Sequence, residues 1–191
     1  MPRRTLDNPI VLAVLGLLLE RPSHPHQMLS DLRRRGDDYA VAINRGSLYT
    51  VVRALADVEW IAVQDQERSG NRPERTVYAL TGAGSRELVR RLDVQIRDPG
   101  REFSRFLGAV AYLGALGPDG AVAALTERRA RLRERTVADA ERLAEVLKGD
   151  VPRLFVIEAE YALALARAEL DWIDSVVDDI RTGALRWPTA N

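Results

Sequence analysis

The sequence contains no cysteine and only two histidines, His24 and His26, among its 191 residues. Without cysteine the chain has no disulfide scaffold, no thiol nucleophile and no thiolate metal site. On a helix, two histidines two positions apart would point their rings about 200° apart, which is poor geometry for sharing one metal ion. No phosphate-binding glycine loop or nucleophile motif is present. We therefore expect no catalytic site, no metal and no cofactor, and we keep an enzyme as one alternative of a different class.

The chain also lacks a net charge, because 28 Lys and Arg residues balance 28 Asp and Glu residues. This balance argues against a protein that coats nucleic acid by bulk electrostatic attraction. The two halves differ, however: residues 1–97 hold 15 Arg against 12 acidic residues, and residues 98–191 hold 13 Lys and Arg against 16 acidic residues. A locally basic binding site is therefore compatible with the composition, and the first half is the place to look for it.

Long apolar runs are scarce, and the only one extends from Ile10 to Leu19. It is too short to span a bilayer, which needs about 20 residues. It does not resemble a signal peptide, since Asp7 interrupts the basic lead and Glu20-Arg21-Pro22 follows where small residues would mark a cleavage site. We expect a buried helix in a cytoplasmic protein.

The first half reads as a series of short helices. Asn8-Pro9 and Ser23-Pro25 predict the starts of the first two helices, and Gly36 predicts the end of the second. Residues 37–44 are then a connection with room for a partial strand. A third helix begins near Gly46-Ser47, and its apolar residues at 3.6-residue spacing form an inner face. Its outward positions are Ser47, Tyr49, Thr50, Arg53 and Asp57.

A β-hairpin follows the third helix. Residues 60–65 and 76–80 are rich in β-forming residues and are separated by turn signals, so a hairpin with a long tip is expected. Thr81 then caps a helix that runs through Ile96. Three helices, a hairpin and a further helix form the order of a winged helix-turn-helix, in which one helix enters the major groove of DNA. The hairpin tip adds Arg68, Asn71, Arg72 and Arg75. An ordinary solubilising role for these charges, with Tyr49 half-buried, is the competing interpretation.

Several segments, read together in order, resemble the PadR family of bacterial transcription regulators. The segments are Leu15-Gly16-Leu17-Leu18 before Arg21-Pro22, Gly46-Ser47-Leu48-Tyr49, Leu55 followed by Trp60-Ile61, and residues 70–81 with Gly84. The resemblance covers about residues 9–95. It implies a winged-helix DNA-binding domain that works as a homodimer, with the recognition helix opening at Gly46 to Tyr49.

The chain departs from the family pattern at two places. His24-Pro25-His26 stands where family members often have His-Gly-Tyr, which replaces a phenol by an imidazole. Glu59 stands where a glycine commonly precedes the hydrophobic pair. Since glycine would adopt a positive φ there, the turn after the third helix is expected to differ in this chain.

The second half is expected to be helical. Asp98-Pro99-Gly100 breaks the preceding pattern, and helical segments follow from Phe103 to the Gly117-Pro118 pair, over about 119–148 and over about 153–181. The middle of the second, residues 127–135, is mostly charged and is expected to be a solvent-exposed arm. The third segment has two apolar stripes, more than a small domain can bury. We assign one stripe to a homodimer interface: Leu154, Ile157, Tyr161, Leu165, Ala168, Trp172 and Val176.

The sequence therefore predicts a mainly α protein with a small β-hairpin. A winged helix-turn-helix DNA-binding domain (1–97) would be followed by a helical dimerisation domain (98–191). We expect a transcriptional regulator, most simply a repressor, that binds double-stranded DNA as a homodimer on an inverted-repeat operator. The expected DNA-contacting residues are Gln27, Asn44, Arg45, Ser47, Tyr49, Thr50, Arg53, Asn71, Arg72 and Arg75.

Two further points stay open at the level of sequence. Some PadR-family members respond to phenolic or planar aromatic compounds, so the resemblance implies a possible small aromatic effector. The aromatic residues of the second half (Phe103, Phe106, Tyr112, Tyr161 and Trp172) are as readily explained as core and interface. A MarR-like winged-helix regulator and a helical protein-interaction module that reads no DNA are the remaining alternatives.

Overall fold

The computed structural model describes residues 5–35, 44–67, 75–100 and 104–187. The chain forms two compact units, residues 1–101 and 102–191, and each is considered separately below. Helix α6 ends at Arg97. In the described part of the chain, none of the helices has the length and apolar character needed to cross a membrane.

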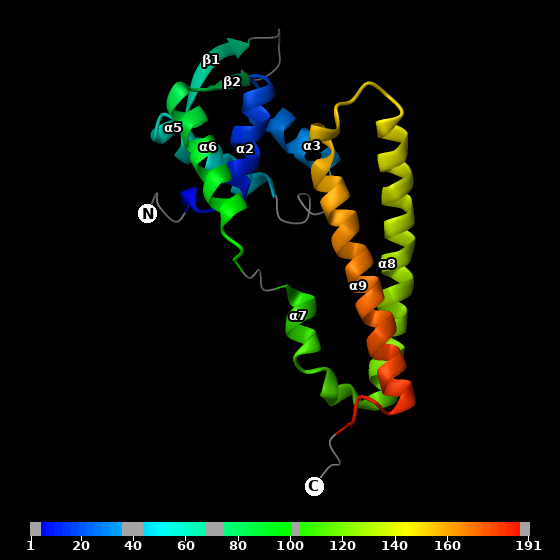
Figure 1. Ribbon diagram of the computed structural model, residues 1–191. Coiled ribbons are helices and arrows are strands. Elements are labelled where there is room, and N and C mark those ends of the chain that lie inside the picture. The colour runs from blue at the N-terminus through cyan, green and yellow to red at the C-terminus, as the bar shows by residue number, and fades with distance from the viewer. Residues whose placement is uncertain (1–4, 36–43, 68–74, 101–103, 188–191) are drawn as a thin grey trace. The chain divides into compact units, whose positions relative to one another are not determined.

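The first unit is a winged helix, as expected. Its elements are α2 (Ile10–Glu20), α3 (Pro25–Arg35), α5 (Arg45–Asp57), β1 (Ile61–Glu67), β2 (Arg75–Leu80) and α6 (Gly82–Arg97) (Figure 1). The apolar run of the sequence is α2, and it is buried on more than one side because α3, α5, β2 and α6 all pack against it. The core side chains are Ile10, Val11, Val14, Leu15, Leu17, Leu18, Met28, Leu29, Leu32, Leu48, Val51, Val52, Leu55, Ile61 and Leu88.

Helix α3 begins at Pro25, as the sequence indicates, but Ser23 is not the residue that caps it. The Ser23 backbone N–H donates to the Tyr78 carbonyl and the Ser23 carbonyl accepts from the Tyr78 N–H, each at 3.0 Å. The cap is supplied by His24, whose Nδ1 accepts from the Gln27 N–H at 3.0 Å. The α2–α3 connection is therefore joined to β2, the second strand of the wing.

The wing is an antiparallel pair whose register runs from Ile61 opposite Leu80 to Glu67 opposite Arg75. Thr81 caps α6 as expected: its Oγ1 accepts from the Gly84 N–H at 3.0 Å, and it donates to the carbonyls of Glu59 and Trp60 at 2.7 and 3.0 Å. These bonds hold the start of α6 against the turn between α5 and β1.

The expectation that Glu59 alters the turn after α5 is wrong. Glu59 has a φ of 58°, so it adopts the left-handed conformation that a glycine would take. Its N–H donates to the Ala56 carbonyl and the Trp60 N–H donates to the Leu55 carbonyl, both at 3.0 Å, which is the Schellman pattern of a helix end. The tertiary bond from Thr81 to the Glu59 carbonyl holds the residue in this conformation.

Replacing Glu59 with glycine is expected to stabilise the first unit by up to about 1 kcal/mol. A non-glycine residue in the left-handed region costs roughly 1–2 kcal/mol, and the added freedom of glycine in the unfolded chain offsets part of the gain. Urea unfolding of Glu59→Gly measures the change. The matched control is Asp57→Gly at the last residue of α5, which should lose about 0.3 kcal/mol, because glycine favours a helix slightly less than aspartate does. A loss of stability in both variants would contradict this explanation.

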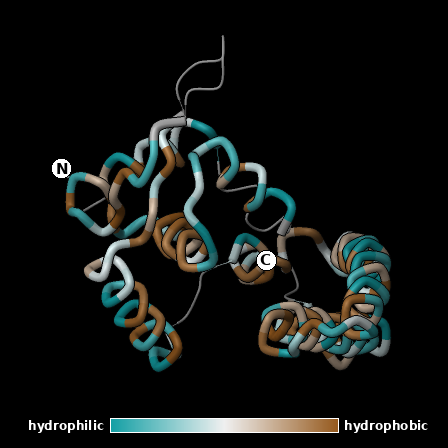
Figure 2. The backbone as a smooth tube through the Cα atoms, turned by 90° about the horizontal axis from the view of Figure 1, so that it is seen from above, coloured by the Kyte–Doolittle hydropathy of each residue, from teal (hydrophilic) through white to brown (hydrophobic). Residues whose placement is uncertain are grey.

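The second unit is a long helical hairpin with a short helix at its start. It contains α7 (Arg105–Val110), the 3₁₀ turn η1 (Leu113–Leu116), α8 (Gly117–Leu147), the 3₁₀ turn η2 (Arg153–Phe155) and α9 (Ile157–Thr182). Figure 2 shows hydrophobic and hydrophilic residues mixed along both α8 and α9, as expected of helices with one apolar and one polar face. The buried contact is made by Ala121 and Leu125 of α8 with Ile173, Val177 and Ile180 of α9.

The charged middle of α8 is largely exposed, as expected, but it is not a free arm. Arg128 Nε donates to the Glu169 carboxylate at 2.6 Å, and Arg129 is paired with Asp174, both on α9. Leu132, within the same segment, is buried. The segment is therefore anchored to α9 through Arg128, Arg129 and Leu132, while most of its other side chains face solvent.

Candidate nucleic-acid interface

The exposed side of α5 is built on an N-cap. Asn44 Oδ1 accepts from the Ser47 N–H at 2.7 Å, and Ser47 Oγ donates to the Asn44 carbonyl at 2.9 Å. One turn later, Thr50 Oγ1 donates to the Gly46 carbonyl at 2.9 Å. Because both hydroxyl protons are used within the helix, the partly buried Ser47 and the exposed Thr50 have only oxygen acceptors to offer. Acceptors of this kind suit the amino groups of cytosine and adenine in the major groove.

The aromatic and cationic groups of the same helix lie on its exposed surface. Arg45 stacks over the Tyr49 ring with 5.5 Å between the guanidinium carbon and the ring centroid. Tyr49 keeps 41% of its surface exposed. Arg53, one turn further, is exposed and has no hydrogen-bond or ion-pair partner among the described residues. Opposite them, Leu48, Val51, Val52 and Leu55 anchor the helix in the core. The helix thus offers phenol, guanidinium and hydroxyl groups from a rigid support.

Of the other expected DNA-contacting residues, Gln27 and Arg75 lie outside the exposed face of α5. Gln27 is partly buried, and its Nε2 donates to Asp31 Oδ1 at 2.9 Å. Arg75 opens β2 opposite Glu67. Asn71 and Arg72 lie outside the described residues.

Sequence reasoning missed a polar cluster around Asp31. Its carboxylate, 3% exposed, binds Arg21 and Arg34 as well as Gln27. The spacing of Gln27, Asp31 and Arg34 on one helix is a signal that could have indicated part of it, since side chains three and four positions apart face each other. Nothing in the local pattern places Arg21 beside them. The described residues contain no group of three or more acidic or histidine side chains that could hold a metal ion.

The expected dimer stripe lies mostly exposed on the second unit. Tyr161 and Leu165 are 67% and 53% exposed, and the other exposed members are Leu154, Ile157, Ala168 and Trp172. Leu154 belongs to η2 rather than to α9, and Val176 is partly buried against the α8–α9 core. The second apolar stripe of the sequence, through Leu163, Ile173 and Val177, is the one that α8 covers. One of the two apolar faces is therefore used within the unit, and the described residues leave the other uncovered.

The aromatic residues of this unit partly pack on one another. Phe106 meets Trp172 edge-to-face with 5.9 Å between ring centroids, and the Arg128 guanidinium lies 3.5 Å over the Phe106 ring. An open groove of about 810 Å³ lies elsewhere, lined mainly by α8 residues 118–130 together with Ile180 and Arg181 of α9. Phe103 lies outside the described residues.

Comparison with known proteins gives one family match and a set of similar folds. Residues 14–90 match the model of the transcriptional regulator PadR-like family. Bacillus subtilis PadR in complex with operator DNA is 18% identical with a TM-score of 0.73, over 91% of this chain and 99% of that one. The same protein in complex with p-coumaric acid is 17% identical with a TM-score of 0.69, over 93% of this chain and 99% of that one. The PadR-like transcriptional regulator BC1756 of Bacillus cereus is 16% identical with a TM-score of 0.60, over 91% of this chain and 98% of that one. No curated protein matches the chain.

Proposed function

Because residues 14–90 form a domain of the PadR-like family of transcriptional regulators, we propose that the chain is a sequence-specific repressor that binds DNA as a homodimer. The observation that carries the proposal is the exposed face of α5, where Ser47, Tyr49, Thr50 and Arg53 stand on a helix anchored in the core of a winged-helix unit. A helix of this kind fits the major groove, which is about 12 Å wide.

The homodimer follows from the uncovered face of α9. Self-association would remove the exposed stripe from water, and a two-fold dimer would present two α5 helices to half-sites about 34 Å apart. An inverted-repeat operator is the DNA counterpart of this symmetry. Binding across a promoter would block access to it, so we assign repression as the outcome and the cytoplasm as the place of action.

A small aromatic effector is the finer part of this proposal. Bacillus subtilis PadR, which shares the fold, has been crystallised with p-coumaric acid. In this chain the aromatic surface of the second unit, including the exposed Tyr112 and Tyr161, would be available to such a compound. A ligand that binds better to the DNA-free state would release the operator.

Arg53→Ala is expected to weaken binding to the chain's own operator by about 1–3 kcal/mol, the range of one good contact to a base edge. Fluorescence anisotropy of a labelled duplex measures the dissociation constant. The matched control is Arg97→Ala on α6, which removes another exposed arginine, one that is paired with Asp93. Equal affinities of wild type and Arg53→Ala would remove α5 as the recognition helix.

A further inference from the structure

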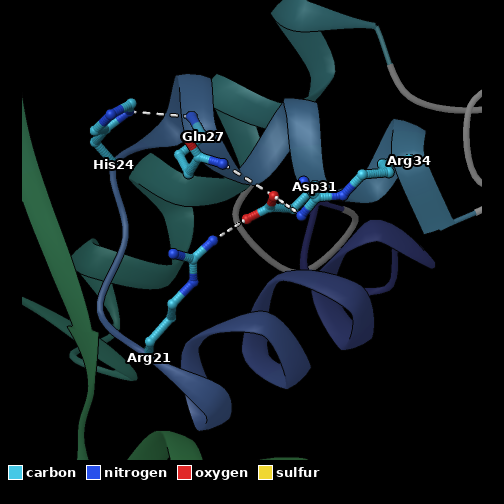
Figure 3. A network of polar contacts seen from close by, with 5 residues as sticks. All are labelled: Arg21, His24, Gln27, Asp31 and Arg34. Atoms are coloured by element: carbon cyan, nitrogen blue, oxygen red, sulfur yellow. Dashed lines mark hydrogen bonds and ion pairs between the residues drawn. The ribbon is translucent and has the colours of Figure 1, made fainter. Parts of the chain in front are cut away.

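Asp31 is a fully paired, buried carboxylate on a helix that is otherwise polar on this side. Its Oδ1 accepts from Gln27 Nε2 at 2.9 Å and from Arg34 Nη2 at 2.7 Å, and its Oδ2 accepts from Arg21 Nη2 at 2.7 Å (Figure 3). Burial raises the pKa of the Asp31 carboxyl, but the bonds from Gln27 and Arg21 and the charges of Arg21 and Arg34 lower it further, so that the pKa lies below its ordinary value. The carboxylate is therefore ionised at neutral pH.

The two arginines remain largely at the surface although Asp31 binds them. The side chain of Arg21 is 58% exposed and that of Arg34 is 76% exposed. An isolated surface ion pair contributes little to stability, about 0–1 kcal/mol. Here one buried anion holds two exposed cations that lie far apart in sequence, and the cluster keeps one net positive charge. Such an arrangement fixes the positions of guanidinium groups without neutralising them.

The cluster lies in the part of the fold that meets the DNA backbone in the proposed function. α3 packs against α5 and corresponds to the first helix of the helix-turn-helix, which crosses the phosphate backbone when the second helix enters the major groove. The connection that carries Arg21 continues into Ser23, which is bonded to β2 of the wing. Arg21 thus comes from the connection that precedes α3, and Arg34 comes from the last turn of α3 itself, the helix that packs against α5.

We infer that Arg21 and Arg34 are a pair of DNA phosphate contacts and that Asp31 is the positioning residue that holds them. The inference rests on the proposed function. Guanidinium groups bind phosphate oxygens well because their donors form a rigid fork, and holding two of them in place before binding lowers the entropy cost of association.

A positioning role and a purely electrostatic role of Asp31 predict opposite changes in DNA affinity for Asp31→Asn. A negative charge beside DNA repels the phosphates, so its removal alone would tighten binding. If Asp31 positions the arginines, its removal weakens binding by roughly tenfold, because two long side chains must then be ordered on the DNA. The sign of the change therefore identifies the role.

The test uses the full chain and a random-sequence 24-base-pair duplex, because phosphate contacts do not depend on base sequence. The dissociation constant is measured by anisotropy over a series of salt concentrations for wild type, Arg21→Ala/Arg34→Ala and Asp31→Asn, at a temperature where circular dichroism shows each variant folded. Matched controls on α6 are Arg90→Ala/Arg97→Ala and Glu87→Gln, since Glu87 binds Arg90 and Arg91 as Asp31 binds its arginines.

We expect the Arg21→Ala/Arg34→Ala variant to lower the salt slope by about 1.8, or about 0.9 for each phosphate that an arginine no longer neutralises. Asp31→Asn should weaken binding in the wild type and have no weakening effect when both arginines are already alanine. An unchanged slope would overturn the phosphate contacts, and unchanged or tighter binding by Asp31→Asn would overturn the positioning role. The Arg21→Ala/Arg34→Ala variant tests the phosphate contacts even if Asp31→Asn lowers the stability of the protein. Failure of the wild type to bind any duplex would instead refute the proposed function.

Discussion

Replacing Gly84 with alanine is expected to destabilise the winged-helix unit by about 3 kcal/mol, at the upper end of overpacking effects. A Cβ at this position would lie 2.0 Å from the Trp60 carbonyl oxygen and 2.8 Å from its carbon. This oxygen cannot easily move, because it accepts bonds from both the N–H and the hydroxyl of Thr81. The alanine would therefore push the start of α6 away from the turn that joins α5 to the wing.

Hydrogen exchange read by mass spectrometry measures this destabilisation separately in the two units. We expect faster exchange in α2, α5 and β1 of Gly84→Ala and little change in α8 and α9. Gly82→Ala is the matched control, two residues earlier in the same helix, where the nearest atom to a new Cβ is the flexible Arg86 Nη1 at 3.6 Å. That variant should be as stable as wild type or slightly more stable. Equal stability of Gly84→Ala and Gly82→Ala would contradict the described packing.

Replacing Tyr161 and Leu165 together with aspartate is expected to convert the proposed homodimer to a monomer. Both side chains are exposed on the uncovered face of α9, and a charge buried at an apolar interface is strongly unfavourable unless it is paired. Loss of the dimer should weaken binding to an inverted-repeat operator by about 10²–10⁴-fold, since the second half-site no longer binds as part of the same molecule.

Sedimentation measures the mass of the variant, and anisotropy measures its affinity for the operator. Val137→Asp is the control, because Val137 is an exposed apolar residue on α8 outside the stripe. We expect it to remain dimeric and to bind fully. A dimer that persists in Tyr161→Asp/Leu165→Asp would place the interface on another surface.

Local sequence signals were sufficient for most of the helices, for the hairpin and for the exposed side of α5, but not for the 3₁₀ turns η1 and η2. The 3.6-residue spacing of Leu48, Val51 and Leu55 separates an inner face from an outer one. Similar periodicity distinguished the two stripes of α9. These features depend on residues within one element, which is why the sequence alone could predict them.

The features that the sequence did not predict depend on contacts between distant residues. Ser23 joins β2 because Tyr78 lies opposite it, and no local pattern pairs the two. Arg128 and Arg129, in the charged middle of α8, pair with Glu169 and Asp174 of α9. Glu59 takes a left-handed conformation because bonds from Thr81 and within the helix end hold it there, which a helix propensity does not reveal.

The most direct test of a dimeric, sequence-specific DNA-binding protein is selection of bound duplexes from a random library by the full chain, followed by sequencing. We expect one enriched inverted repeat whose half-sites are centred about 10 base pairs, or a multiple of one helical turn, apart, and we expect the enrichment to disappear with Arg53→Ala. The absence of an enriched motif, or enrichment of a single unrepeated half-site, would contradict the account.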